Sequence, residues 1–366
     1  MNNDLLFQVA LTMIPQIGDV HAKALIARYG DAESVFKAPR RQLEHMEGIG
    51  TVRANSIKSF TDFTLCEAEL SFIEKYKITP LFITETNYPK RLLHCYDSPP
   101  LLYYRGEADL NSAKIITIVG TRNNSEYGKI ACEKLVDALR GSDILIVSGL
   151  AFGIDSLAHK AALKNNLPTV GVLAHGLDRL YPPQNKSLAK AMMQAGGLIT
   201  DFRSGTNPDR QNFPRRNRIA AGLCDALVVI ESGKKGGSLI TAELANSYNR
   251  EVFAIPGRMT DSKSEGCHYL IKNNKAMLIT CADDLLETMN WKEEKKNAPG
   301  KQCELFPDLT EPEKIIFDLI LGKSNIHIDE LYNRSGMGSG MVAAALLSLE
   351  MGGIIVTMPG KSYKIN

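Results

Sequence analysis

The sequence contains no uncharged apolar run close to the roughly 20 residues that a membrane-spanning helix requires. Its first residues, MNNDLLFQVALTMIPQIG, lack the basic region and the small-residue cleavage site of a secretory signal peptide. We therefore predict a cytoplasmic protein with no membrane partner.

Paired cysteines are also missing. The seven cysteines are an odd number, and no two of them have the C-x-x-C spacing of a zinc or redox site. This pattern argues against a disulfide framework and predicts reduced, mostly buried thiols with no metal site. At 366 residues the chain has room for two or three domains.

The chain has neither a strong net charge nor a standard nucleotide-binding motif. Its net charge is +2, so any affinity for nucleic acid must come from local clusters of cations. Both the dinucleotide motif G-x-G-x-x-G and the Walker A motif G-x-x-x-x-G-K-[ST] are absent. We therefore expect no cofactor and no catalytic residues of a nicotinamide or ATP enzyme.

The hydrophobic pattern divides the chain into four segments. Residues 1–75 have a helical pattern, and residues 76–291 alternate Ile- and Val-rich runs with amphipathic helices. Residues 292–309 are charged and contain proline and glycine, which predicts a linker. In residues 310–366 helices precede two short strands, as in a small winged-helix domain.

The apolar runs of the second segment predict its fold. They are residues 115–119, 144–147, 169–173, 198–200, 226–230 and 252–255. Near-continuous apolar strands separated by helices are typical of a parallel sheet that is covered on both faces. The predicted fold class is α/β, with a Rossmann-like, doubly wound, mostly parallel sheet. Ligands of such sheets bind beyond the carboxyl ends of the strands.

Two glycine turns characterise the helical segment. Gly18 and Gly50 each stand in a pattern of an apolar residue, glycine, three residues and alanine at the start of a helix. In helix-hairpin-helix units the amides of such turns face a DNA phosphate. Plain connections within a helical bundle explain the pattern equally well, so both interpretations stay open.

The stretch from Asn212 to Leu244 predicts a phosphate-binding site. It contains the cationic turn Phe213-Pro214-Arg215-Arg216-Asn217-Arg218, with a helix expected to begin near Asn217. An apolar strand follows, and then a Lys234-Lys235-Gly236-Gly237 loop that opens into a helix. Backbone N–H groups at a helix start, flanked by cations, favour phosphate oxygens. With no nucleophile or acid pair nearby, we expect the phosphates to be held and not cleaved.

Residues after two other predicted strands contribute to the same edge. Gly120, Thr121, Arg122 and Ser125 follow the first strand, where Arg122 offers a planar fork suited to phosphate. Asp155 and His159 lie four residues apart on one helix face after the second strand. An acid–base dyad is conceivable there, but we favour a structural pair because no nucleophile accompanies it.

Six motifs, in this order along the chain, resemble those of the DNA-processing protein A family (DprA, also called Smf). They are IVGTR, SGLAFGID, GLDRLYPPQN, FPRRNRIAAGL, the glycine-rich stretch VVIESGKKGGSLITAELA and VFAIPG. The resemblance is dense over residues 114–282. It departs at His268, where the family usually has asparagine, and this puts the hydrogen bond of that amide in doubt. Cys267 and His268 as a metal pair are a remote alternative.

The resemblance implies a non-enzymatic protein that binds single-stranded DNA and loads the recombinase RecA onto it during natural transformation. It also implies a homodimer and single-strand binding protein as a further partner. The predicted DNA-binding residues are Gly120, Thr121, Arg122, Ser125, Phe213, Arg215, Arg216, Asn217, Arg218, Lys234, Lys235, Gly237, Ser238 and Thr241.

Two other function classes remain as alternatives. Residues 236–243 are similar in layout to the P-G-G-x-G-T-x-x-E motif of cytokinin-activating phosphoribohydrolases, and Glu243 stands at the place of the catalytic glutamate. Leu239 and Ile240 replace the Gly-Thr pair and would crowd the phosphate. The other alternative is a regulatory adaptor that acts through the tail, where residues 336–349 contain no lysine or arginine to bind a DNA groove.

Overall fold

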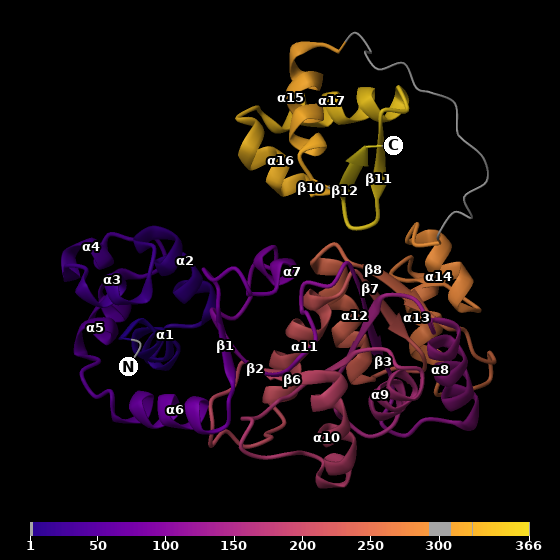
Figure 1. Cartoon of the computed structure of the whole chain (residues 1–366), viewed down its shortest axis with the longest axis horizontal. Helices are drawn as coiled ribbons and strands as arrows, with labels where there is room; N and C mark the ends of the chain where they lie inside the picture. The colour runs from indigo at the N-terminus through magenta and orange to yellow at the C-terminus, as the bar shows by residue number, and fades with distance from the viewer. Residues whose placement is uncertain (1–2, 293–308, 324, 366) are drawn as a thin grey trace. The chain divides into compact units, whose positions relative to one another are not determined.

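The computed structural model describes residues 3–292, 309–323 and 325–365, which form two compact units, residues 1–280 and 281–366 (Figure 1). Almost all of the predicted linker, at residues 293–308, lies outside the described residues. The domain boundaries predicted at residues 75 and 291 stay predictions. No helix in the described ranges has the length and apolarity needed to span a membrane.

The first segment is helical, as its pattern predicts. Its helices are α1 (Asn3–Met13), α2 (Asp19–Tyr29), α3 (Ala32–Lys37), α4 (Arg40–Glu44), α5 (Gly50–Ser59) and α6 (Thr64–Lys75). Their buried faces share one core, to which β1 (Thr79–Phe82) and β2 (Leu101–Gly106) contribute Phe82, Leu101 and Tyr103. The helical domain therefore packs directly on the edge of the sheet.

The sheet has nine strands in the order β1-β2-β6-β5-β4-β3-β7-β8-β9. Its remaining strands are β3 (Lys114–Val119), β4 (Ile144–Ser148), β5 (Thr169–Val172), β6 (Gly196–Thr200), β7 (Ala226–Val229), β8 (Glu251–Ala254) and β9 (Met277–Leu278). All pairs from β6 to β9 are parallel, whereas β1 and β2 add an antiparallel edge. The predicted class is confirmed, and the six predicted strands are present.

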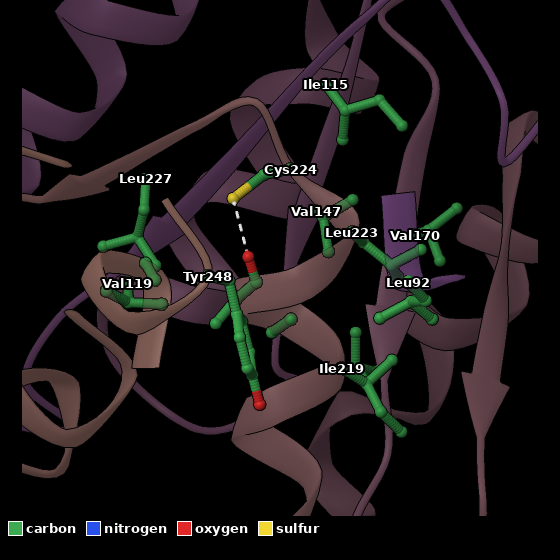
Figure 2. Close-up of a cluster of buried hydrophobic side chains, with 14 of the residues drawn as sticks. Leu92, Ile115, Val119, Val147, Val170, Ile219, Leu223, Cys224, Leu227 and Tyr248 are labelled. Atoms are coloured by element: carbon green, nitrogen blue, oxygen red, sulfur yellow. Dashed lines mark hydrogen bonds between the residues drawn. The ribbon is translucent and has the colours of Figure 1, made fainter. Parts of the chain in front are cut away.

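Helices lie on the sheet in two groups. Those of the sheet domain are α7 (Lys90–Leu93), α8 (Glu126–Ala138), α9 (Ile154–Lys164), the 3-10 turn η1 (Pro183–Asn185), α10 (Lys186–Ala195), α11 (Asn212–Leu223), α12 (Gly237–Ser247) and α13 (Glu265–Lys272). Helix α9 contacts α8 and α10, and α11 contacts α12. Figure 2 shows Ile219 and Leu223 of α11 in one core with the strand residues Val147, Val170 and Leu227.

Helix α11 begins earlier than the sequence suggests. We interpreted Phe213–Arg218 as a turn with the helix starting near Asn217, but the helix starts at Asn212. Pro214 is the third helical residue, where the backbone N–H has no partner within the helix, so proline costs no hydrogen bond there. The arginines after it are therefore spaced around a helix instead of lying along an open turn.

The second unit has the element order predicted for the tail. It contains α14 (Ala282–Thr288), α15 (Glu311–Leu321), β10 (Ile326–His327), α16 (Ile328–Ser335), α17 (Ser339–Met351), β11 (Ile355–Met358) and β12 (Ser362–Ile365). The last three strands pair in the order β10-β12-β11, and Ile316, Leu331, Leu346 and Ile355 share a small core. Helices followed by this hairpin confirm the winged-helix prediction.

Candidate nucleic-acid interface

The point where the strand order reverses lies between β3 and β7. The chain leaves β3 for β4 on one side and later crosses back to β7 on the other. The turn after β3 and the loop after β7 are held together, because the Thr121 N–H donates to the Glu231 carbonyl over 2.8 Å. Such a switch point is the usual ligand site of a doubly wound sheet.

Two of the predicted residues, Arg122 and Phe213, meet at this edge. The exposed Arg122 guanidinium lies over the half-buried Phe213 ring, with 4.7 Å from Cζ to the ring centroid. Tyr181, from the loop after β5, approaches Phe213 edge to face at 6.1 Å and is 44% exposed. Tyr181 is not among the residues that we predicted to bind DNA, so the sequence missed it as part of this cluster.

Glycine fixes the position of the Arg122 turn. Gly153, before α9, has φ +77°, and a Cβ there would collide with the Thr121 carbonyl and the Arg122 backbone. The Ile154 N–H donates to that same Thr121 carbonyl over 3.2 Å. Because the loop after β4 can approach so closely, the Arg122 turn is supported from below by backbone.

The hydroxyls near Arg122 support the turn. Ser125 caps α8 by accepting from the Gly128 N–H, and its own hydroxyl donates to the buried Glu231 carboxylate over 2.6 Å. Thr121 Oγ1 accepts from the Asn123 N–H over 3.2 Å. Both hydroxyls are engaged within the protein, and Glu231 is the partner that the sequence did not indicate.

The loop after β7 presents a cationic helix start. Lys234, Lys235 and Gly237 are exposed, and within the described part of the chain the N-cap residue of α12 makes no side-chain capping hydrogen bond. By contrast, Ser238 and Thr241 are buried, and the Ser238 hydroxyl donates to Ser232 over 2.8 Å. The lysines and the amides of this loop can therefore reach a phosphate, whereas the two hydroxyls form the interior of the turn.

The arginines of α11 divide between surface and interior. The Arg215 side chain is 58% exposed, and Asn217 is half-buried. Arg216 is buried and donates to the Val172 carbonyl, while Arg218 pairs with Asp201 and Asp19 at 2.7 Å each. Of the five arginines between residues 203 and 218, Arg216 and Arg218 thus stabilise the fold. The exposed members are Arg203, Arg210 and Arg215.

Asp155 and His159 are both buried on α9. Burial raises the pKa of Asp155, against the opposing charge of Arg216. His159 Nε2 lies 2.5 Å from the Gly149 carbonyl and Nδ1 lies 2.6 Å from the Thr169 hydroxyl, so both ring nitrogens are engaged. This arrangement supports the structural interpretation of the pair, with His159 tying the loop after β4 to β5.

Burial lowers the pKa of His159 to about 4. An unfolded chain binds a proton at this residue near pH 6.5, whereas the folded chain does so only near pH 4. We expect the free energy of unfolding to lose about 2–3 kcal/mol from this residue as the pH falls from 6.5 to 4. Urea titrations across that range should show a flatter pH dependence for His159→Gln than for the unchanged chain, and parallel curves would contradict the prediction.

The residues that would serve a phosphoribohydrolase or a metal pair interact with other groups of the protein. Glu243 forms a 2.6 Å ion pair with Lys275, which engages the carboxylate that a hydrolase would use. Cys267 is buried, with Sγ 3.7 Å from the Val229 carbonyl, and His268 Nε2 lies 3.1 Å from the Gly257 carbonyl. Neither set is arranged as a free acid or as a metal pair.

Family models match three parts of the chain. The model described as DNA recombination-mediator protein A matches residues 79–290. A model of the DprA winged helix domain matches residues 305–361, and one of the helix-hairpin-helix motif matches residues 7–64. The last match favours the helix-hairpin-helix interpretation of the glycine turns over plain connections.

Relatives and solved structures agree with these matches. Protein Smf of Synechocystis is 31% identical, with 99% of each chain covered. The X-ray structure of DNA processing protein A from Streptococcus pneumoniae has a TM-score of 0.68 and 31% identity, covering 78% of this chain and 98% of that one. A structure of DNA processing protein A from Helicobacter pylori, described for its single-stranded DNA binding mode, has a TM-score of 0.53 and 27% identity. It covers 58% of this chain and 96% of that one.

Proposed function

Since the chain belongs to the DNA recombination-mediator protein A family, we propose that it binds single-stranded DNA without sequence preference along the carboxyl edge of its sheet. The observation that carries the proposal is the contact between Arg122 and Phe213 at the switch point of the sheet. A cation against an aromatic ring offers one group to a phosphate and the other to a base.

The surrounding groups extend this contact into a path for a strand. Lys234 and Lys235 flank the start of α12 beyond the Arg122 turn, and Arg215 lies exposed two residues after Phe213. Tyr181 adds a second ring beside Phe213. Single-stranded DNA is held by such a combination of backbone neutralisation and stacking, which every base sequence permits.

The finer function that we propose is the loading of RecA onto the bound strand during natural transformation and homologous recombination. In this proposal the protein acts as a homodimer, with single-strand binding protein as a further partner, and it catalyses no reaction on the DNA. The match to the family model over residues 79–290 supports this assignment.

A salt titration tests the binding mode. We expect the log of the affinity for oligo-dT to fall with the log of the salt concentration at a slope of about −3. Each neutralised phosphate contributes about 0.7 to this slope, and four exposed cations are available: Arg122, Arg215, Lys234 and Lys235. Replacing both lysines by alanine should reduce the slope by about 1.4. Fluorescence anisotropy of labelled oligo-dT measures both values.

The control replaces a lysine pair away from this edge. Lys160 and Lys164 lie on the exposed side of α9, and changing both to alanine should leave the slope within error. A duplex of the same length should bind more weakly than the single strand, because its bases are not free to stack on Phe213 and Tyr181. Equal slopes for the two lysine pairs would rule out the α12 loop as a phosphate site.

A further inference from the structure

A second cationic surface, with none of the Arg122 cluster's residues in its lining, lies along α10. A groove of about 600 Å³ runs between α10, the end of β2 and the loop after β5. Leu177, Leu180 and Met193 form its partly buried apolar floor, which continues into the core below. Arg105, Lys186 and Lys190 stand around that floor.

Three of the four cations that line this groove have no acidic partner within the described part of the protein. Among the described residues, no carboxylate pairs with Arg105, Lys186 or Lys190. Lys186 is the first residue of α10, and the first turn of that helix contains no acidic residue. A lysine at this position lies at the positive end of the helix dipole. This arrangement is unfavourable unless an anion compensates both the lysine ammonium and the helix N-terminus.

The fourth cation of the groove is already partnered. Arg179 pairs with Asp178 at 2.7 Å and also donates to Asn207 in the loop after β6. Asp178 in turn accepts from the Gly205 N–H over 3.0 Å. This side of the groove is therefore a fixed wall, and the unpaired charge is concentrated on Arg105 and on the two lysines of α10.

The lining distinguishes a peptide from a nucleic acid. Among the residues that the structure describes, aliphatic and charged side chains line the groove, and none of them is an aromatic ring on which a base could stack. Single-stranded DNA obtains much of its affinity from such rings, and the Arg122 cluster provides them. An apolar floor between unpaired cations instead complements a segment that carries both carboxylates and apolar side chains.

We propose that the α10 groove binds a short acidic segment of a partner protein, whose carboxylates pair with Arg105, Lys186 and Lys190 while an apolar side chain covers Leu177, Leu180 and Met193. The spacing of the two lysines, one helical turn apart, selects two carboxylates at similar separation. The groove shares no lining residue with the proposed DNA path, whose Tyr181 lies in sequence between Leu180 and Pro183 of the groove.

The test uses the full chain and a fluorescein-labelled octapeptide containing four aspartates and two leucines. We expect the peptide to bind, and the double change Lys186→Glu and Lys190→Glu to weaken it at least about tenfold. The matched control is Lys160→Glu with Lys164→Glu, which has the same spacing on α9 and should change the affinity less than about twofold. Met193→Asp should also weaken the peptide, because it places a like charge on the apolar floor.

Two altered octapeptides and the affinity for oligo-dT test the two parts of the proposed recognition. An octapeptide with asparagine in place of aspartate, and another with serine in place of leucine, should each bind at least about fivefold more weakly, since each removes one half of the recognition. Oligo-dT affinity should be unchanged by the Lys186 and Lys190 reversal. Loss of oligo-dT binding with no effect on the peptide would overturn the proposal in favour of DNA, as would a failure of the acidic peptide to bind.

Discussion

Replacing Arg122 by alanine is expected to weaken binding of oligo-dT about 10- to 100-fold. The change removes a phosphate partner and also the cation that holds the Phe213 ring, 4.7 Å from the guanidinium. Phe213→Ala should cost a similar factor, because it removes the ring on which a base stacks. Anisotropy titrations at one fixed salt concentration measure both, with homopolymers of different base giving the same ratio.

The control for Arg122 is another exposed arginine of the same domain. Arg140 lies between α8 and β4, at the amino ends of the strands and therefore at the opposite edge of the sheet. Arg140→Ala should leave oligo-dT affinity within about twofold. Since Arg122 and Phe213 act on the same nucleotide, their double variant should lose less than the product of the two single losses. Equal effects of Arg122→Ala and Arg140→Ala would show that oligo-dT affinity depends only on the net charge of the protein and not on a site at Arg122.

The strands of the sheet could be predicted because their burial demands a simple pattern. Residues 226–230 form a continuous apolar run and residues 115–119 are interrupted only by Thr117, as expected for strands covered on both faces. The edge strands β1 and β2 gave no comparable signal. Residues 79–82 include Pro80, and β2 pairs antiparallel with β6 while its Leu101 and Tyr103 contribute to the core of the helical domain.

The location of the site followed from the fold, but the role of each cation did not. Parallel strands bring Arg122 and the Lys234–Lys235 loop to one edge whatever their side chains do. Whether an arginine lies at the surface depends on its turn of the helix and on distant partners. Arg215 and Arg218 are three residues apart on α11, yet their side chains are 58% and 10% exposed.

The partners of Arg218 come from segments that the sequence assigns to different domains. Asp19 begins α2 in the helical domain, whereas Asp201 follows β6 in the sheet. Lys23 of α2 adds bonds to the Leu93 and Cys95 carbonyls, and the buried Glu69 of α6 accepts from Ser204. No local pattern predicts the bonds of Lys23 and Glu69, because their partners lie at least 70 positions away in the sequence.

These bridges connect the helical domain to the segment that carries Phe213 and Arg215. Asp19, the first residue of α2, pairs with Arg218 of α11, which ties the start of α2 to α11. Glu69 fixes the loop after β6 through both the amide and the hydroxyl of Ser204. The helical domain thus holds the proposed DNA-binding residues of α11 in place from behind.

Replacing Arg218 by methionine is expected to lower the free energy of unfolding by about 3–5 kcal/mol. The Asp201 side chain is only 4% exposed, and among the described residues its Oδ1 has no hydrogen-bond partner, so Arg218 is the group that compensates its charge. The change also takes a partner from Asp19 and a donor from the Asp97 carbonyl. Chemical denaturation of the first unit, monitored by far-ultraviolet circular dichroism, measures the loss.

A second change separates the lost charge pair from lost packing. In the Arg218→Met background, Asp201→Asn removes the uncompensated carboxylate, and we expect it to restore a large part of the stability even though Asp201→Asn alone is destabilising. Arg215→Ala serves as the matched control on the same helix. Its contact with Asp19 is 3.9 Å long and exposed, so its cost should stay below about 1 kcal/mol. Additive losses in the double variant would mean that Arg218 stabilises α11 by packing alone, and not by compensating the buried charge of Asp201.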